Sequence, residues 1–388
     1  DICLCTISRA PNSYTGEDTA EFQCHGSPVV LRAVLEAAFS LGARQALPGE
    51  FTKRAFLNGR MDLSGAEAVA DIIDAETAEA ARNAAGQLGG AISRRIDEIY
   101  GTLTDISSHY HAVLDYPDED IEDFTLARYE SDIDRCTAVL ESLRASYDSG
   151  KLLHSGVPAA IVGRPNAGKS SLLNAVLGYD RAIVTDIPGT TRDTIEEKLR
   201  LGGVLLRLTD TAGIRETDDE IERMGVTRSR RAMEQADLVL AVIDGHSEIT
   251  PEDIELIKCA ERAPHGIVIL SKHDLGSLSK MPKTTLPVIE ISSVTGEGLD
   301  KLEATVRALF PMPAAPAGEI LTNARQFDAV SRALESMKAA GGAMRSGCTP
   351  DIVLTETETA MAALGELTGR TVREEVTNRI FERFCVGK

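Results

Sequence analysis

A glycine-rich turn followed by a lysine and a serine is the feature of this sequence most directly suited to chemistry. Residues 159–170 read AAIVGRPNAGKS, so an apolar run leads into the spacing G-x-x-x-x-G-K-S from Gly163 to Ser170. Glycines in such a loop let successive backbone N–H groups point at phosphate oxygens. The following lysine, Lys169, reaches the β- and γ-phosphates, and the serine hydroxyl can ligate Mg²⁺. The sequence therefore predicts a nucleoside triphosphate site that uses Mg²⁺.

The segments around this loop must position it. The apolar run before it predicts a strand, and the following SLLNAVLG predicts a helix whose N-terminal dipole faces the bound anion. Residues 157–310 then alternate strand-like and helical patterns, which is typical of a mainly parallel sheet covered on both faces. Ligand-binding loops of such a sheet gather beyond the carboxyl ends of its strands.

Two motifs after the loop stand in the order expected of a nucleotide hydrolase. The sequence Asp210-Thr211-Ala212-Gly213 ends a strand, which suits an aspartate near Mg²⁺ and a glycine N–H near the γ-phosphate. The sequence GTTRD at 189–193 lies between the two, and we assign its Thr191 to completing the Mg²⁺ shell. The predicted Mg²⁺ ligands are thus Ser170 and Thr191.

A third motif, Ser271-Lys272-His273-Asp274, favours guanine. A carboxylate at Asp274 can accept hydrogen bonds from both N1–H and the exocyclic amine of guanine, and adenine lacks that donor pair. An ATPase of the same fold is the alternative. GTPases usually carry Asn where this chain has Ser271, so we expect weaker nucleotide affinity. The predicted GTP-binding residues are Asn166, Ala167, Gly168, Lys169, Ser170, Ser171, Thr185, Thr190, Thr191, Asp210, Thr211, Ala212, Gly213, Ser271, Lys272, Asp274, and Ser292 with Ser293 in the last base-contacting loop.

The expected catalytic glutamine is missing. Ras-like enzymes orient water with a Gln just after the DxxG motif, and this chain has Ile214 there. Asn166 could place its side-chain carbonyl beside the phosphates as a ligand of a monovalent cation, or it could stabilise the loop through a hydrogen bond. Glu222 could hold the attacking water, or it could be a solvated helix charge. The residues alone leave both pairs of alternatives open.

Composition limits the remaining possibilities. A chain of 388 residues exceeds one ordinary core, so two or three domains are expected. The net charge of −19 argues against binding a polyanion over a broad surface. Seven cysteines without a CxxC pair indicate a reducing compartment, and we expect a cytoplasmic protein without a membrane-spanning segment. Because the chain starts at Asp1 in a strand-like run, we expect residues to be missing before it.

Three kinds of secondary-structure pattern along the sequence predict a multidomain protein. We expect an α+β domain at 1–58, incomplete at its start, and a helical domain formed by 59–150 together with 315–388. An α/β domain of the Ras-like P-loop type at 151–312 is inserted into it. Ser64 and Glu67 suggest a capping box at the first helix of the helical domain. A helical apolar stripe follows at Ile92, Ile96, Ile99, Leu103 and Ile106.

The flanks, read with the central motifs, resemble the bacterial and organellar tRNA-modifying GTPases of the MnmE/TrmE type, which act at the wobble uridine. The resemblance covers essentially the whole chain, and the C-terminal FCVGK is its most diagnostic part. It rests on YTGEDTAEFQCHG (14–26), LPGEFTKRAFLNGRMDLSGAEAVADIIDA (47–75), GRPNAGKSSLLN (163–174), IVTDIPGTTRD (183–193), DTAGIRE (210–216) and FCVGK (384–388).

The resemblance implies a cation mechanism for GTP hydrolysis. In this family K⁺ at the interface between two G domains does the work of an arginine finger. Asn166 matches the cation-ligating asparagine, Thr185, Ile187 and Thr190 lie in the loop that completes the K⁺ shell, and Glu222 matches the glutamate that orients water. The candidate catalytic residues are Glu222, Asn166, Thr191, Arg192 and Cys385.

The resemblance also implies a one-carbon donor and partners. The N-terminal domain of the family binds a 5-formyltetrahydrofolate or related folate, and the matching contacts here are Glu21, Arg60 and Lys388. On composition alone Glu21 and Arg60 would be ordinary surface charges, and Cys385 would be a small buried hydrophobe. The expected assembly is a homodimer working with an FAD-dependent partner, which makes most of the tRNA contact.

Two other functions fit part of the sequence. A regulatory or ribosome-assembly GTPase would bind RNA itself and modify nothing, but it would need a basic RNA-binding segment that this chain lacks. A scaffold with a degenerate nucleotide site is suggested only by Ser271. FCVGK and the folate-like residues argue against the regulatory or ribosome-assembly GTPase, and measurable K⁺-dependent GTP turnover would eliminate the scaffold.

Overall fold

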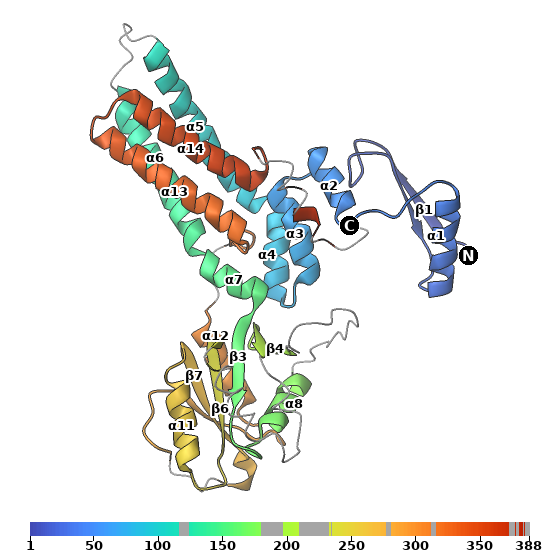
Figure 1. The fold of residues 1–388 in the computed structure, drawn as a ribbon, viewed down its shortest axis with the longest axis vertical. Helices are drawn as coiled ribbons and strands as arrows, with labels where there is room; N and C mark the ends of the chain where they lie inside the picture. Colours follow the sequence, from blue (N-terminus) through green and yellow to red (C-terminus); the bar gives the residue numbers. More distant parts are fainter. Residues whose placement is uncertain are drawn as a thin grey trace. The chain divides into compact units, whose positions relative to one another are not determined.

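The predicted apolar stripe lies at the centre of a helical bundle. The computed structural model describes residues 1–115, 124–179, 197–208, 233, 235–276, 281–311, 316–371, 377, 380–382 and 384. The long helix α5 (Ala91–Asp115) packs with α6 (Phe124–Ala145) and α14 (Pro350–Thr368), and α13 (Ala324–Arg345) packs with α6 and α14 (Figure 1). Segments far apart in the sequence therefore form one bundle.

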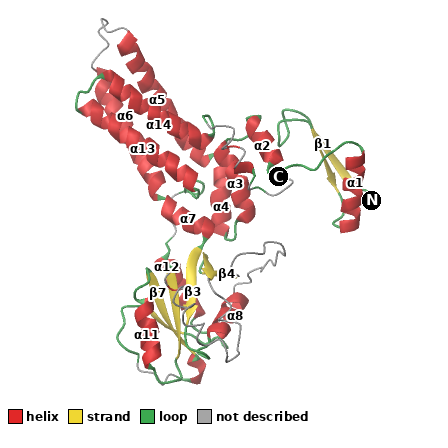
Figure 2. Cartoon of the chain, in the orientation of Figure 1, coloured by secondary structure: helices red, strands yellow, loops and turns green. Residues whose placement is uncertain are grey.

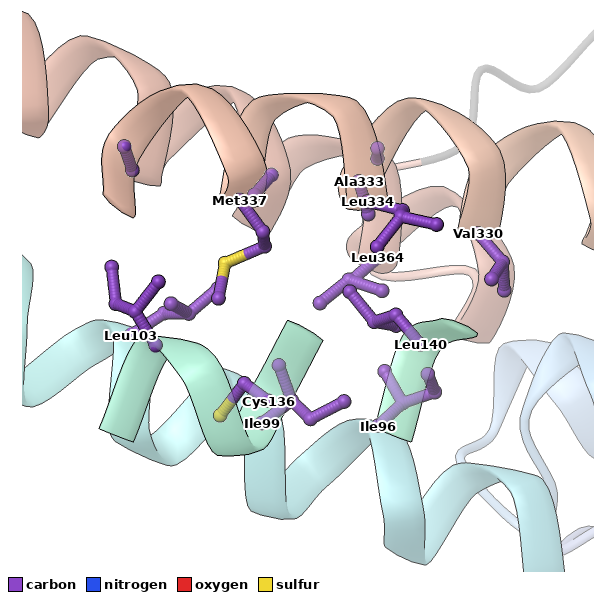
Figure 3. Close-up of a cluster of buried hydrophobic side chains, with 14 of the residues drawn as sticks. Ile96, Ile99, Leu103, Cys136, Leu140, Val330, Ala333, Leu334, Met337 and Leu364 are labelled. Atoms are coloured by element: carbon purple, nitrogen blue, oxygen red, sulfur yellow. The ribbon is translucent and has the colours of Figure 1, made fainter. Parts of the chain in front are cut away.

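The bundle core is filled by aliphatic side chains from all of these helices. Ile92, Ile96, Ile99, Leu103 and Ile106 of α5 are at most 2% exposed, so the predicted stripe is confirmed. Figure 3 shows Ile96, Ile99 and Leu103 meeting residues of the facing helices. Each fully buried aliphatic side chain contributes about 1.5–3 kcal/mol. The facing residues include Cys136 and Leu140 of α6, Val330, Ala333, Leu334 and Met337 of α13, and Leu364 of α14.

The predicted capping box at Ser64 and Glu67 is wrong. Helix α3 (Leu63–Asp74) begins two residues earlier than that box requires, and its N-cap is Asp62, whose side chain accepts a hydrogen bond from Gly65 N–H. Glu67 is buried and instead forms a bidentate pair with Arg325, with both N···O distances 2.8 Å. Glu67 has the spacing of a capping residue, but its carboxylate pairs with Arg325, which is distant in the sequence.

The N-terminal residues form a small antiparallel pair of strands and two helices. Strand β1 (Leu4–Ser8) pairs with β2 (Thr19–Gln23) in the register Leu4↔Gln23, followed by α1 (Pro28–Ser40) and α2 (Glu50–Leu57). Phe381 and Phe384, close to the C-terminus, pack against Phe56 and Ala66. Phe381 and Phe384 therefore lie on α2 and α3.

The predicted α/β segment is a six-stranded sheet in the order β4-β5-β3-β6-β7-β8. The parallel strands are β5 (Val204–Leu208), β3 (Val157–Val162), β6 (Leu238–Asp244), β7 (His265–Ser271) and β8 (Val288–Glu290). Strand β4 (Glu197–Leu201), which the sequence patterns did not predict, adds to the edge antiparallel to β5. Apart from this strand the sheet is parallel, as predicted.

Helices cover both faces of this sheet. Side chains alternate along β3, so Ala159 and Ile161 face α8 (Lys169–Tyr179) and α12 (Leu299–Leu309), whereas Ala160 and Val162 face α11 (Pro251–Ala260). Figure 2 shows the helices on either side of the strands. The carboxyl ends of β3, β6 and β7 are thereby free to carry loops.

By contacts the chain divides into two compact units. One comprises Asp1–Ala75, Ala80–Tyr147 and Ala314–Lys388, and includes α4 (Ala78–Leu88) in part; the other comprises Glu76–Glu79 and Asp148–Pro313. Helix α7 (Tyr147–Ser155) begins at the boundary. Among the described residues, no helix combines the length and apolar character needed to cross a membrane.

Candidate nucleotide-binding site

The glycine-rich loop connects β3 to α8, as predicted, and its glycines are required by their surroundings. A Cβ on Gly163 would lie 2.4 Å from the carbonyl oxygen of Val242 in β6. Gly168 has a φ of 95°, a conformation that side chains disfavour, and a Cβ there would lie 3.3 Å from Ser271 Oγ. The loop therefore packs its backbone directly against the ends of β6 and β7.

A tight turn inside the loop presents Asn166. Ala167 N–H donates to the carbonyl of Arg164 across 3.2 Å, Pro165 occupies the second position of the turn, and Asn166 has a φ of 62°. Proline followed by a residue with positive φ is typical of a type II turn, and asparagine tolerates that conformation. The Asn166 side chain is exposed and makes no hydrogen bond to another described residue. The loop-stabilising bond considered as an alternative is therefore not formed within the described chain.

Lys169 lies over the loop that it follows. Its Nζ donates to the carbonyl oxygens of Gly163 at 2.8 Å and Arg164 at 2.9 Å, and burial lowers the pKa of its ammonium group. A half-buried cation whose hydrogen-bond partners in the described chain are neutral carbonyls gains from the arrival of an anion. Ser170 and Ser171, in the first turn of α8, are exposed. These groups fit a phosphate chain seated on the loop.

The predicted guanine-binding lysine is fixed by a residue that the sequence reasoning missed. Lys272 has a φ of 59°, and its Nζ lies 2.6 Å from Oδ2 of Asp244 at the end of β6. Burial raises the pKa of Asp244, but hydrogen bonds from Lys272 and from His246 N–H outweigh it, so the pKa lies below its usual value. An acidic residue ending an apolar strand was the signal that could have identified Asp244.

Asp274 is oriented by Ser292. The buried Ser292 hydroxyl donates to Asp274 Oδ1 across 2.8 Å and accepts from Thr295 N–H. This hydrogen bond fixes one oxygen of the Asp274 carboxylate. The carboxylate is exposed, so it remains accessible to a base. Ser293 is half-buried and makes no interaction with another described residue. Ser292 therefore acts on the base through Asp274.

Ser271 links the base-recognition loop to the phosphate loop. Its buried hydroxyl lies 2.5 Å from the carbonyl oxygen of Ala167 and 3.1 Å from that of Ile243. A hydroxyl carries a single hydrogen, so the shorter contact to Ala167 is the stronger bond. The residue that departs from the usual Asn thus joins the two halves of the site.

Several predicted residues lie outside the described part of the chain. They belong to the segments 180–196 and 209–232 and to the C-terminal end, so no geometry is given for them. These residues are Thr185, Ile187, Thr190, Thr191, Arg192, Asp210, Thr211, Ala212, Gly213, Glu222, Cys385 and Lys388.

The predicted folate residues are described only in part. Glu21 is exposed on β2 opposite Thr6, and Arg60 is exposed directly after α2. No hydrogen bond or ion pair joins Glu21 to Arg60. The side chain of Arg60 passes Gly16, where an added Cβ would lie 3.2 Å from its Cγ. No cluster of three or more His, Cys, Asp or Glu suited to a metal occurs among the described residues.

Comparison with known proteins identifies relatives along the whole chain. A family model described as the MnmE helical domain matches residues 63–385, and one described as the GTP-binding protein TrmE N-terminus matches residues 1–60. The tRNA modification GTPase MnmE of Roseiflexus sp. (strain RS-1) is 44% identical over 402 residues, covering 100% of this chain and 86% of the relative. Those of Symbiobacterium thermophilum and Natranaerobius thermophilus are 44% and 41% identical, with the same coverage.

Solved structures also resemble part of this chain. The G domain of the T. maritima FeoB iron transporter is 26% identical and covers 39% of this chain and 98% of its own, with a TM-score of 0.29. The family models and the relatives, in contrast, extend over the helical and N-terminal segments as well as the nucleotide site. The chain belongs to the MnmE family of tRNA modification GTPases.

Proposed function

We propose that this chain is a GTP-hydrolysing tRNA modification enzyme whose hydrolysis is stimulated by K⁺ when the G domains of two copies meet. The observation that carries the proposal is the turn at Asn166, which holds an exposed amide beside the phosphate loop without a partner in the described chain. Amide and carbonyl oxygens suit a hard cation. Asn166 would hold K⁺ together with Thr185, Ile187 and Thr190.

The other site residues take roles around the same loop. Lys169 binds the phosphates, Ser170 and Thr191 would hold Mg²⁺, and Asp274 selects guanine with Ser292 fixing its carboxylate. Glu222 orients the attacking water, and Arg192, which follows Thr191 in the sequence, is a further candidate catalytic residue. A cation at Asn166 would supply the charge of an arginine finger, which is worth about 10³–10⁵ in rate. That factor equals about 4–7 kcal/mol of barrier.

We further propose that the cycle serves wobble uridine modification. With an FAD-dependent partner, the homodimer would install a (carboxymethyl)aminomethyl group at C5, using 5-formyltetrahydrofolate or a related folate held by Glu21, Arg60 and Lys388. The contact of Phe384 with Gly49, just before α2, supports a role for the adjacent Cys385 near that pocket. The net charge of −19 supports leaving most tRNA contact to the partner.

GTP hydrolysis by the purified protein in KCl and in NaCl tests the cation mechanism. We expect faster turnover in KCl, and loss of that stimulation in Asn166→Ala. Glu222→Ala should be slow in both salts. Asn174→Ala, an exposed asparagine on α8, is the matched control and should behave as wild type. Equal wild-type rates in the two salts would refute the mechanism.

Mass spectrometry of tRNA tests the pathway. Cells lacking the protein should accumulate tRNA with unmodified wobble uridine, and the wild-type gene should restore the modification. An unchanged tRNA profile, with K⁺-stimulated GTP hydrolysis intact, would instead favour a regulatory or ribosome-assembly GTPase.

A further inference from the structure

The phosphate-loop turn has a charged anchor that the reaction scheme above does not use. Arg164 opens the turn, and its side chain extends to the start of α11 rather than into solvent. Its Nε lies 3.2 Å from Glu252 Oε2, as an ion pair without hydrogen-bond alignment, and its Nη1 lies 3.5 Å from Asp253 Oδ2. Glu252 is 76% exposed and Asp253 only 4%, so the two carboxylates are not equivalent.

Asp253 is held rigidly by its own helix. It is the N3 residue of a capping box, in which its carboxylate accepts from Thr250 N–H at 2.9 Å and from the Thr250 hydroxyl at 2.7 Å. The Thr250 hydroxyl is also close to Asp253 N–H. A capping box fixes the first turn of a helix. Arg164 is therefore paired with a carboxylate that cannot follow it if the loop moves.

The backbone of Arg164 is equally constrained. Its carbonyl oxygen accepts hydrogen bonds from Ala167 N–H and from Lys169 Nζ, so it closes the turn and contacts the ammonium group of Lys169. At the other end of the turn, the carbonyl of Ala167 accepts from Ser271 Oγ. Only Pro165 and Asn166 lie between the two anchored residues.

We propose that Arg164 is a positioning residue for the GTPase reaction, which it serves by tying the Asn166 turn to Glu252 and Asp253 of α11. The turn is thus held from two sides, by α11 through Arg164 and by β7 through Ser271. Asn166 contacts the cation, whereas Arg164 sets the position and direction of that contact. The inference rests on the proposed role of Asn166 as a K⁺ ligand.

A surface ion pair without this function would behave differently. Exposed pairs contribute little to stability, and losing one lowers the melting temperature slightly without changing the response to K⁺. A misplaced ligand instead weakens the step that uses it, and displacement of about 1 Å can cost as much as 10²-fold in rate. The K⁺ concentration that gives half-maximal hydrolysis therefore distinguishes the two.

The test measures GTP hydrolysis by the full chain against K⁺ concentration, together with the affinity for a fluorescent GDP analogue. In Arg164→Ala we expect the half-maximal K⁺ concentration to rise about threefold to tenfold, with GDP affinity nearly unchanged. Arg164→Lys keeps the charge but loses the planar fork, so it should recover part of the K⁺ response. Glu252→Gln and Asp253→Asn should each shift it in the same direction as Arg164→Ala.

The matched control is Glu255→Gln, an exposed glutamate of α11 whose side chain makes no hydrogen bond or ion pair with a described residue. It should leave the K⁺ response unchanged. If wild type is stimulated by K⁺ while Arg164→Lys, Glu252→Gln and Arg164→Ala all keep the wild-type half-maximal concentration, the inference is overturned and the proposed function survives. If wild-type hydrolysis does not depend on K⁺, the inference and the proposed function are both refuted. Circular dichroism checks that each variant is folded, and Glu252→Gln remains informative where Arg164→Ala does not fold.

Discussion

The hydroxyl of Ser271 donates a hydrogen bond to the carbonyl oxygen of Ala167 across 2.5 Å, and this bond joins the end of β7 to the phosphate loop. Gly168 packs on the same serine, so a bulkier residue at 168 would force the two segments apart. The base-recognition and phosphate-binding parts of the site are therefore directly linked through Ser271. A ligand that touches either end acts on both.

Removing this hydroxyl should weaken nucleotide binding. A neutral hydrogen bond contributes about 0.5–1.5 kcal/mol, so Ser271→Ala should raise the dissociation constant for GDP about twofold to tenfold. Titration with a fluorescent GDP analogue measures it. Ser155→Ala is the control, because that hydroxyl bonds only the carbonyl of Lys151 in its own helix. Wild-type affinity in Ser271→Ala would show that the bond does not couple the two loops.

The base preference should follow the carboxylate of Asp274. In Asp274→Asn the amide offers one acceptor and one donor, which matches N1–H and the C2 carbonyl of xanthine instead of the two donors of guanine. We expect GTP affinity to fall and the affinity for xanthosine triphosphate to rise, in competition titrations of both nucleotides. Ser292→Ala should weaken GTP binding without raising xanthosine triphosphate binding, since it frees Asp274 but leaves its charge. A variant that keeps its preference for GTP contradicts the assignment.

The Asp244–Lys272 pair should give an acid-dependent contribution to stability. The pKa of Asp244 is lowered in the folded protein, so its contribution is present above the unfolded pKa of about 3.9 and is lost as pH falls through the folded value. The pair is partly exposed and should contribute about 0.5–1 kcal/mol. Calorimetric melting of wild type and Asp244→Asn should differ constantly from pH 7 to about 5 and converge below about 4. A difference that vanishes already near neutral pH would contradict this.

The bidentate pair of Glu67 and Arg325 should dominate the stability of the helical unit. Arg325 also donates to the last carbonyls of α14, at Glu366 and Leu367, so one guanidinium ties α3, α13 and α14 together. Breaking one partner of a buried pair costs about 3–5 kcal/mol, and we expect that loss in Glu67→Ala by denaturant unfolding followed by circular dichroism. Arg332→Ala, which removes two exposed ion pairs, with Asp328 and Glu366, should cost less than about 1 kcal/mol. Equal losses would mean that burial of Glu67 is not decisive.

The sequence predicted the elements of this chain that local patterns determine. The phosphate loop, the parallel sheet and the α5 stripe follow from spacing and periodicity, which a single segment carries. What could not be predicted comes from partners far apart in the chain. Glu67 satisfies a capping pattern yet pairs with Arg325, and nothing in the sequence around Arg164 indicates its ion pair with Asp253 of α11. Strand β4 was missed because only Leu199 and Leu201 of its five residues are apolar, whereas the predicted strands are nearly continuous apolar runs.

The close contact between Gly49 and the C-terminal residues should support the proposed folate pocket. Gly49 has a φ of 63°, and a Cβ there would lie 2.8 Å from the carbonyl oxygen of Phe381 and 3.0 Å from Cβ of Phe384. Gly49→Ala should therefore cost about 1–2 kcal/mol for the left-handed conformation, and about 1–3 kcal/mol more for the clash. Displacing Phe384 would also move Cys385, which follows it. We expect weaker binding of 5-formyltetrahydrofolate in a calorimetric titration.

Gly59→Ala separates the two effects of that substitution. Gly59 has a φ of 67°, close to that of Gly49, but a Cβ there meets nothing within 4 Å. It should cost only the conformational term and leave folate binding near the wild-type value. Because both glycines flank α2, the pair distinguishes loss of helix stability from displacement of the chain end. If both variants bind folate equally well, the C-terminal residues do not form part of the pocket.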